Sequence, residues 1–565
     1  MRDEFSKSDP FTLQIFRNAL VSIADHMAIT IARSARSIVV KEALDFSSAL
    51  FDKNCEMIAQ GTCIPAHLGS MPEAVLAAAR TFAGNFHDGD VVALNDPFQG
   101  STHLPDIILV RPCFLNAELL GYAAVLAHHI DVGGRVPGSS ASDSTEIYQE
   151  GLRIPPVKLV ARGQTEEAWL RLISANVRAP DKVLGDLRAQ LAACQVGEVG
   201  LVDLARRLGV NHFRSLSLEL LEYTEEYTKS QIADVIPDGT YRATDFIDDD
   251  GRSDAEIQIC VAIQVSGGSI EVDFTGSSGQ AATAINSVGN FTRSVTWACI
   301  RSVLDSKVPN NSGFFRPIKI TLPEQSIVNA QMPAAVAARA LTGFRIADTL
   351  FRALADALPD RVPATGSAEP EIGVTIAGDD LNGVAFVYFE SLFGSWGARS
   401  NIDGTDGCSG VVVNYSNTPI EIIEADYPLQ IEAYGFVADT GGVGQSRGGL
   451  SIERRIRFLG RKGLLQLRSD RRRHPPRGLQ GGGQGSPSGA WLTTSDGVER
   501  SLPSKCLIHL AHGDLVRILV PGAGGFGLPR MRAHSLIERD IREGKMSADH
   551  AATFYDYHQT ATAYG

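Results

Sequence analysis

The sequence predicts a multidomain α+β protein. Its 565 residues exceed the size of one ordinary core, and a prior of about 150 residues per domain gives two to four domains. Segments with helical spacing dominate residues 165–232, whereas short strands alternate with glycine-rich turns from about 370 to 520. Because the strands do not alternate regularly with helices, a doubly wound parallel sheet is disfavoured.

We divide the chain into four parts. The turn signal Ile236-Pro237-Asp238-Gly239 marks the first boundary, because proline and glycine there favour a tight turn. The parts are an N-terminal metal-binding α+β domain (1–235), a central α+β domain (236–365), a β-rich C-terminal domain (366–530) and a helical tail (531–565). The charged tail suits a clasp on another domain or subunit.

Apolar spacing and turn residues predict the elements of the N-terminal part. Asp9 and Pro10 form a plausible cap for a long amphipathic helix over 10–34. Further helices are expected at 72–82, 166–175 and 180–205, and strands at 37–40, 49–52, 57–59 and 91–94.

Alternating residues predict a strand meander at the start of the central part. Its strands are expected at 241–247, 256–265 and 270–274. Helices over 287–304 and 344–358 follow, with a strand at 318–322 between them.

Charge and composition exclude several classes of function. Lysine and arginine number 52 against 65 aspartates and glutamates, so the net charge of −13 opposes binding to nucleic acid or to anionic membranes. The eight cysteines contain no CxxC pair, which argues against zinc fingers and a disulfide framework. The N-terminus shows no apolar segment of a secretion signal, and we expect a cytoplasmic protein.

Histidines and aspartates gather in one segment of the N-terminal part. Five of the 13 histidines lie between residues 67 and 129, together with Asp96, Asp106 and Asp131. Two strand-like runs, 106–114 and 119–129, flank a polar break there. If they form a hairpin in which residue 115 faces residue 119, Asp106 lies directly opposite His128, and His103 lies near Asp131.

That hairpin register predicts a metal site. Opposed side chains have Cβ atoms roughly 4.5 to 5.5 Å apart, so an imidazole and a carboxylate can reach one divalent cation. His103 could supply a third ligand across a local kink, and Asp45, in a loop-like segment, a fourth. Nitrogen and oxygen ligands without a thiolate suit Zn²⁺, Mn²⁺ or Fe²⁺.

Another interpretation of the same residues is structural, because buried histidines and aspartates usually satisfy hydrogen bonds in turns. His129 alternates to the opposite face of the strand from His128, so we expect it to support the site or contact the substrate rather than bind the metal.

Other motifs have weaker functional interpretations. The GxGxxG match at 522–527 has too little chain after it for a dinucleotide domain, and the GxSxG match at 444–448 leads into a strand rather than a helix. No GxxxxGK[ST] motif is present. The basic run 468–473 is either a solvated surface or a clamp for phosphate or carboxylate beside the glycine-rich segment 478–483.

Several short motifs, taken together, resemble those of the hydantoinase B family over nearly the whole chain. The family contains B subunits of N-methylhydantoinases and caprolactamase, part of 5-oxoprolinases, and subunits of acetone and acetophenone carboxylases. The resemblance rests on Asp45-Phe46-Ser47-Ser48, Asn95-Asp96-Pro97, His103-Leu104-Pro105-Asp106, His128-His129-Ile130-Asp131, Gln149-Glu150-Gly151, Pro309-Asn310-Asn311 and Arg447-Gly448-Gly449.

The resemblance implies a hydantoinase B-like fold and a partner: a hydantoinase A-type subunit that binds ATP with Mg²⁺ and phosphorylates the carbonyl oxygen of the substrate. It also implies that this chain binds a divalent metal, Zn or Mn with Fe possible, and completes the reaction. The implied metal ligands match Asp45, His103, Asp106 and His128.

We expect further roles for four residues and a small cyclic amide as the substrate. Asp131 or Glu150 would move a proton, and His129 and Asn95 would contact the substrate. Two alternatives stay open: a subunit of a ketone carboxylase acting on a ketone plus bicarbonate, and a non-catalytic scaffold subunit.

Overall fold

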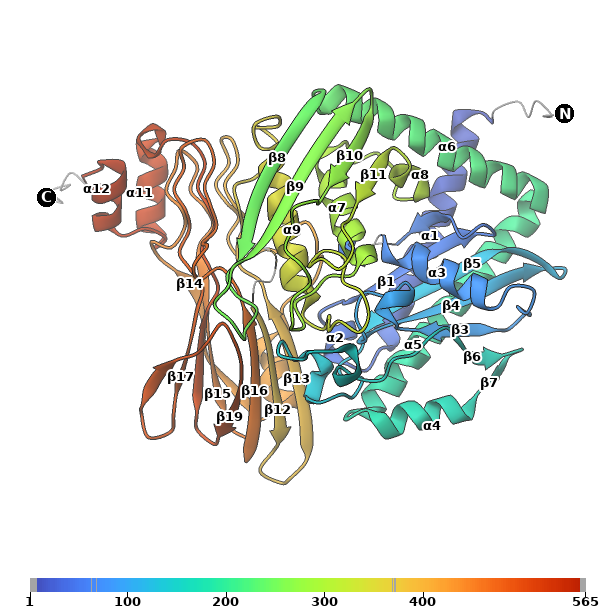
Figure 1. The fold of residues 1–565 in the computed structure, drawn as a ribbon, viewed down its shortest axis with the longest axis horizontal. Helices are drawn as coiled ribbons and strands as arrows, with labels where there is room; N and C mark the ends of the chain where they lie inside the picture. Colours follow the sequence, from blue (N-terminus) through green and yellow to red (C-terminus); the bar gives the residue numbers. More distant parts are fainter. Residues whose placement is uncertain (1–7, 62–63, 68, 368, 370–371, 559–565) are drawn as a thin grey trace, which may run out of the picture.

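The computed structural model describes residues 8–61, 64–67, 69–367, 369 and 372–558. Within these residues the chain forms four β-sheets, with helices between and around them (Figure 1). The N-terminal part lies at the right of Figure 1, the C-terminal sheets lie at the left, and the central part joins them at the top. The mixed helix and strand content confirms the α+β class.

A seven-stranded sheet with antiparallel pairs organises the N-terminal part, in the order β2-β1-β5-β4-β3-β6-β7. Its strands are β1 (Phe46–Asp52), β2 (Met57–Gln60), β3 (Val91–Leu94), β4 (Asp106–Leu115), β5 (Glu118–His128), β6 (Val157–Ala161) and β7 (Gln164–Thr165). The second and third expected strands and the strand at 91–94 are thereby confirmed.

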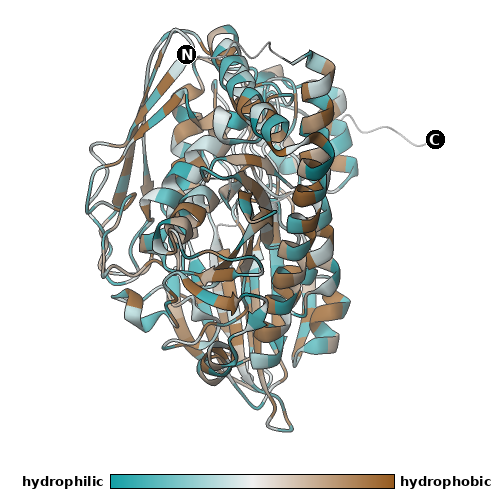
Figure 2. Cartoon of the chain, turned by 90° about the vertical axis from the view of Figure 1, so that its right-hand side faces the viewer, coloured by the Kyte–Doolittle hydropathy of each residue, from teal (hydrophilic) through white to brown (hydrophobic). Residues whose placement is uncertain are grey.

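Helices cover both faces of this sheet, which explains why its central strands are apolar throughout. Leu109 and Val125 face the core shared with α1 (Pro10–Ser34) and α5 (Pro180–Leu208). Ile108 and Leu126 face a smaller core shared with α3 (Ser70–Thr81). Figure 2 shows brown and teal residues alternating along the long helices, as expected of helices that bury one side.

The expected strand at 37–40 is wrong, because these residues form the short helix α2 (Ile38–Lys41). Ser37 caps it, and its side-chain oxygen accepts a hydrogen bond from the Val40 amide at 3.3 Å. The β-branched run Ile38-Val39-Val40 favours a strand by propensity, but the cap and burial of all three residues decide for a helix.

The central part combines a four-stranded sheet with α7 (Gly289–Val303) and α9 (Arg339–Leu354), which pack on each other. The sheet order is β11-β10-β9-β8, and α9 lies against β8 and β9. Its strands are β8 (Gly239–Ile247), β9 (Ile257–Ser266), β10 (Ser269–Asp273) and β11 (Ile318–Thr321). The expected meander is confirmed, and α9 begins five residues before its expected start.

Two further sheets form the β-rich C-terminal part, ordered β13-β12-β16-β19 and β14-β15-β20-β17-β18. Their strands are β12 (Ile372–Asp379), β13 (Ala385–Leu392), β14 (Leu429–Val437), β15 (Ser451–Phe458), β16 (Lys462–Ser469), β17 (Gly489–Thr493), β18 (Glu499–Ser501), β19 (Lys505–Ala511) and β20 (Leu515–Leu519). These strands interleave between the two sheets, so neither sheet can form from one continuous segment.

The remaining helices connect these parts. They are α4 (Glu167–Asn176), α6 (Val210–Val235), α8 (Ser312–Phe315), α10 (Ile420–Asp426), α11 (His534–Arg542) and α12 (Ala548–Tyr555). The last two agree with the expected helical tail. Arg532, just before α11, pairs with Asp403 at 2.7 Å and with Asp540, which fixes the tail to the C-terminal part.

Helix α1 is the one described helix that is long and apolar enough to cross a membrane by length and composition. It packs against α5, and its Phe16, Leu20 and Met27 are buried in the shared core. Core helices of folded proteins pass the same test of length and composition.

Candidate metal centre

The β4–β5 hairpin places Asp106 directly opposite His128, which confirms the register inferred from the sequence. The two side chains therefore share one face of the sheet. The turn differs from the expectation, because the register shifts after Cys113 and Leu115 pairs with Glu118 rather than with residue 119. This irregularity lies at the far end of the hairpin and leaves the Asp106 end unchanged.

A third strand brings Asp45 to the same row. Strand β1 pairs with β5 through Phe46 and Ala127, so Asp45 lies beside His128 on the side away from Asp106. The His128 amide donates a hydrogen bond to the Asp45 carbonyl at 3.0 Å, which extends the pairing by one residue. Asp45 and Asp106 therefore lie on either side of His128, at the ends of the neighbouring strands β1, β5 and β4.

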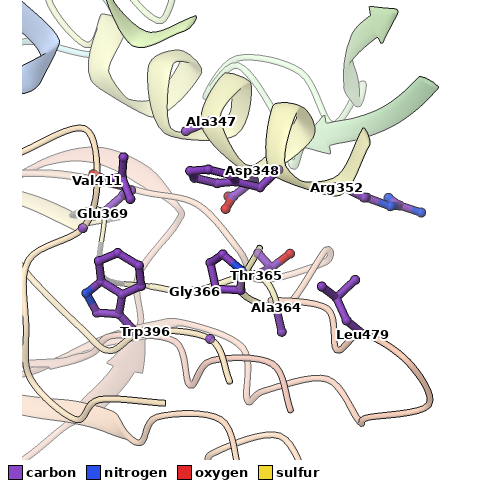
Figure 3. A pocket seen from close by; sticks show the side chains of 14 residues that line it. Ala347, Asp348, Arg352, Ala364, Thr365, Gly366, Glu369, Trp396, Val411 and Leu479 are labelled. Atoms are coloured by element: carbon purple, nitrogen blue, oxygen red, sulfur yellow. The ribbon is translucent and has the colours of Figure 1, made fainter. Parts of the chain in front are cut away.

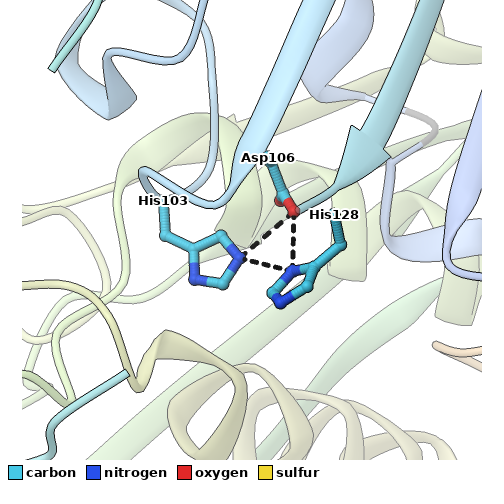
Figure 4. Close-up of side chains that lie close together, drawn as sticks. All are labelled: His103, Asp106 and His128. Atoms are coloured by element: carbon cyan, nitrogen blue, oxygen red, sulfur yellow. Dashed lines mark hydrogen bonds and ion pairs between the residues drawn. The ribbon is translucent and has the colours of Figure 1, made fainter. Parts of the chain in front are cut away.

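His103 completes the cluster from the turn that precedes β4. The Asp106 amide donates to the His103 carbonyl at 3.1 Å and closes this turn. His103 Nε2 then lies 3.1 Å from Asp106 Oδ1 and 3.1 Å from His128 Nδ1, and the last two atoms are also 3.1 Å apart (Figure 4).

This triangle of two nitrogens and one oxygen suits a divalent metal. Its three ligand atoms lie within 4.8 Å of one another, and such a spacing fits an ion bound at about 2.0–2.2 Å. The other ring nitrogen of His103, Nδ1, lies 3.2 Å from the Ala337 carbonyl. Donation of the Nδ1 proton to this carbonyl leaves the Nε2 lone pair directed at the cluster, as in metal-binding histidines.

Burial keeps the imidazoles of His103 and His67 in the neutral form, which is the form that binds metals. Desolvation lowers the pKa of His103 to about 3, and the pKa of the neighbouring His67 to about 4. Burial acts to raise the pKa of Asp106, but the positive charge of Arg339 holds that pKa well below its usual range. The cluster therefore presents the Asp106 carboxylate beside the neutral imidazole of His103.

Burial also raises the pKa of Asp45, to about 6, although His128 acts in the opposite direction. Asp45 lines the same cavity as the three clustered residues, but it is not part of the tight triangle. Asp45 therefore lies beside the cluster, and its role as a fourth metal ligand stays a prediction.

The cavity beside the cluster has a volume of about 80 Å³, several times the space needed by one water. The N-terminal sheet, α9 and the C-terminal sheet of β12, β13 and β16 each form part of its wall. Polar and charged groups on this wall are Asp45, His67, His103, Asp106, His128, Arg339, Ser391, Tyr415 and Arg468. Phe389 stacks on His128 with ring centroids 5.3 Å apart.

The four other predicted site residues lie outside this cavity wall. His129 faces away, as its strand parity predicts, and its Nε2 lies 3.0 Å from Gln190 Oε1 on α5. Asn95 is occupied by the backbone: its amide nitrogen donates to the carbonyls of Leu104 and Leu152, and its oxygen accepts from the Ile154 amide. Asn95 therefore holds two loop segments together, and His129 connects the end of β5 to α5.

Asp131 and Glu150 are likewise engaged elsewhere. Asp131 accepts hydrogen bonds from the Gly133 and Gly138 amides and pairs with Arg178 at 3.1 Å, so the structure does not bring it to His103. Glu150 Oε1 accepts from the amides of Val336 and Ala337 at 2.9 Å each. Because Ala337 also contacts His103, Glu150 positions a metal-site residue through one backbone segment.

Sequence reasoning missed the role of Arg339, and it counted His67 among the histidines without giving it a role. Arg339 Nη2 lies 2.8 Å from Asp106 Oδ2, and both side chains are buried. His67 Nε2 lies 4.0 Å from the same oxygen, while its Nδ1 contacts Ser47 Oγ at 2.9 Å. The clustering of histidines signalled His67, but no local motif marks Arg339, which is 233 residues from its partner.

A second cavity lies between α9 and the loops around Trp396 (Figure 3). It has a volume of about 40 Å³ and contains Glu369, whose Oε1 accepts from the Val412 amide at 2.8 Å. Burial raises the pKa of Glu369 to about 7. Val413, next in the chain to Val412, lines the metal-site cavity, so Glu369 anchors one of its walls.

Comparison with known proteins assigns the chain to a class. The family model for Hydantoinase B/oxoprolinase matches residues 9–529, and the chain belongs to this family. The resemblance expected from the sequence is thereby confirmed.

Individual relatives match over almost their full length. An uncharacterized protein of Methanocaldococcus jannaschii is 37% identical over 553 residues, covering 97% of this chain and 96% of the relative. The putative B subunit of a D-/L-hydantoinase from Pseudomonas sp. (strain NS671) is 31% identical, covering 98% and 95%. The beta subunit of the caprolactamase from Pseudomonas jessenii is 33% identical, covering 97% and 96%.

Two solved structures share the fold. The ATP-dependent caprolactamase from Pseudomonas jessenii superposes with a TM-score of 0.93 and 32% identity, covering 98% of this chain and 97% of that chain. An acetone carboxylase chain superposes with a TM-score of 0.90, covering 97% and 79%, but only 20% of residues are identical. The second likeness concerns the fold alone.

Proposed function

We propose that this chain is the metal-binding B subunit of an ATP-dependent hydrolase of small cyclic amides. Its partner would be a hydantoinase A-type subunit that binds ATP and Mg²⁺ and phosphorylates the substrate carbonyl oxygen. The observation that carries the proposal is the convergence of His103, Asp106 and His128 on one buried point. The relation to the B subunit of a hydantoinase and to an ATP-dependent caprolactamase supports the reaction class.

His103, Asp106 and His128 would hold the metal, with Asp45 as the fourth ligand, and Zn²⁺ or Mn²⁺ suits this donor set, with Fe²⁺ also possible. When bound, such an ion polarises substrate oxygens and lowers the pKa of water, which makes a nucleophile available at neutral pH.

The residues around the cluster would orient and shield the reaction. Arg339 fixes the Asp106 carboxylate and leaves its Oδ1 free to face the two histidines. Phe389 holds the His128 ring by stacking and contributes an apolar wall. The aromatic side chains of Phe291, Phe344, Phe389 and Phe393 on the wall would limit access of bulk water to an activated substrate.

A ketone carboxylase subunit is the second candidate, because the fold is shared with an acetone carboxylase. The same cavity would then bind a ketone and a bicarbonate-derived group. A scaffold subunit without a site is disfavoured, since burial of two histidines, an aspartate and an arginine at one point is costly without a ligand to bind. We also place the protein in the cytoplasm, in keeping with its unpaired described cysteines.

The deciding experiment combines this chain with an A-type subunit and ATP. One reaction contains hydantoin or 5-oxoproline, and the other contains a ketone with labelled bicarbonate. The proposal predicts ATP-dependent ring opening that is lost in His103→Ala and kept in the exposed control His212→Ala. Incorporation of label into a ketone, without ring opening, would replace the hydrolase with the carboxylase.

A further inference from the structure

The cavity contains a buried cation that the proposed metal site does not use. Arg468, on β16, is 8% exposed and lines the cavity wall. Among the described residues its buried Nη1 has no hydrogen-bond partner. An arginine rarely stays buried without a carboxylate or other acceptor, so this group is arranged for a ligand.

The C-terminal sheet directs this guanidinium into the cavity. Arg468 pairs with Gly373 on β12, and Gly373 pairs with Ser391 on β13, so the three lie in one row across the sheet. A Cβ atom on Gly373 would lie 2.5 Å from Arg468 Nε and 2.6 Å from its Cζ. Only glycine leaves room for the guanidinium there.

The aromatic ring of Phe389 connects this group to the metal-binding cluster. The Arg468 guanidinium lies 5.2 Å from the centre of the Phe389 ring, and His128 stacks on the same ring. Cation–π contact orients the guanidinium without using its N–H donors. The donors therefore stay available to a molecule in the cavity.

The other arginines of the basic run 468–473 have protein partners. Arg471 pairs with Asp348 and Asp245 in the core, Arg472 donates to the Leu502 carbonyl at 2.6 Å, and Arg473 donates to a carbonyl at the surface. The arginines of this run therefore form neither a single solvated surface nor a single anion-binding clamp. Arg468 is the member that faces the cavity.

The charges on the cavity wall indicate whether a bound molecule should be anionic or cationic. The wall contains two acidic side chains, Asp45 and Asp106, and two arginines, Arg339 and Arg468. Their formal charges sum to zero. A divalent metal, which the proposed function requires, would add two positive charges in a buried space. An anionic group is needed to offset them.

We propose that Arg468 is a substrate-binding residue that holds an oxyanion carried by the substrate beside the metal-binding cluster. The proposal rests on the proposed function and deepens it. The planar guanidinium donates two parallel N–H bonds to a phosphoryl group or to a carboxylate. Either group can belong to the substrate: the first is added by the partner subunit, and the second is present in amino-acid-derived lactams.

Binding of inorganic phosphate and of acetate to the full chain tests this role without relying on activity. Isothermal titration would compare wild type with Arg468→Gln, Arg468→Lys and Gly373→Ala. Gly373→Ala keeps the charge but displaces the guanidinium. The matched control is Arg461→Gln, since Arg461 is exposed in the turn just before β16 and pairs with Asp379. Metal content, circular dichroism and the thermal midpoint are measured on each sample.

We expect Arg468→Gln and Gly373→Ala to weaken binding of the preferred anion by about tenfold or more, and Arg468→Lys to weaken it less. Arg461→Gln should bind as wild type does. Preference for phosphate would identify the phosphoryl group, and preference for acetate a substrate carboxylate.

The role of Arg468 is overturned if wild type binds neither anion, or if folded Arg468→Gln and Gly373→Ala bind both anions as wild type does. Loss of the metal from Arg468→Gln would also contradict it. Failure of wild type to hold a metal would instead refute the proposed function, and anion binding would still report on Arg468.

Discussion

Asp106 connects the two histidines of the proposed metal site to a buried arginine, and the variant Asp106→Asn tests both contacts. Its Oδ1 faces His103 and His128, whereas Oδ2 pairs with Arg339 at 2.8 Å. Asparagine has nearly the same shape but carries no charge. We therefore expect the variant to bind no metal. In metal-free protein it should also be less stable, because Arg339 loses the carboxylate that pairs with it.

The size of the stability loss in metal-free Asp106→Asn follows from the burial of the Asp106–Arg339 pair. The side chains of Asp106 and Arg339 are 1% and 8% exposed, so water cannot replace the lost carboxylate. Removing one member of such a pair costs about 3–5 kcal/mol. The double variant Asp106→Asn/Arg339→Met removes both charges and should lose less stability than the sum of the two single variants.

The assay is urea unfolding of metal-free protein, followed by fluorescence and by circular dichroism so that coincident transitions justify a two-state analysis. Asp143→Asn is the control, because its pair with Arg135 is exposed and is worth less than about 1 kcal/mol. A loss below about 1 kcal/mol in Asp106→Asn, or strictly additive losses in the double variant, would refute the role given to this buried pair.

Two further predictions concern groups near the site. Burial raises the pKa of Glu369 from 4.5 to about 7, so the folded protein keeps a proton that the unfolded chain has lost, and the associated stability is lost as the pH rises from 4.5 through 7. Glu369→Gln should remove about 3 kcal/mol of that decline, and parallel curves of unfolding free energy against pH for the two proteins would contradict this cause. Gln190→Leu should cost about 1–3 kcal/mol, because His129 Nε2 and the carbonyls of Ile107 and Val125 lose their partner, while metal content stays as in wild type. Metal loss in Gln190→Leu would instead connect His129 to the metal.

The cluster of His103, Asp106 and His128 was predictable where it depends on local pairing. The polar break between the two apolar runs predicts where the hairpin turns, and the register that follows sets Asp106 opposite His128. The alternation of strand residues likewise predicts that His129 lies on the opposite face from His128, and in the structure α5 covers that face. Both relations concern residues in neighbouring strands, so the spacing of residues along the chain is enough to predict them.

The rest of the cavity depends on contacts between parts distant in sequence. Arg339 comes from α9 and Arg468 from β16, and no spacing rule relates either residue to the hairpin. The sequence placed Asp131 near His103 by extending the hairpin, but the Gly133–Gly138 turn and Arg178 draw its carboxylate away. The short helix α2 was missed because propensity outweighed the capping signal of Ser37.

The most direct test of the central claim is the metal content of the purified full chain, measured by elemental analysis alongside His103→Ala and the control His212→Ala. We predict one transition-metal ion per chain in wild type and in His212→Ala, and its loss in a folded His103→Ala. A wild-type chain without stoichiometric metal, or a His103→Ala variant that retains it, would contradict the metal centre proposed here.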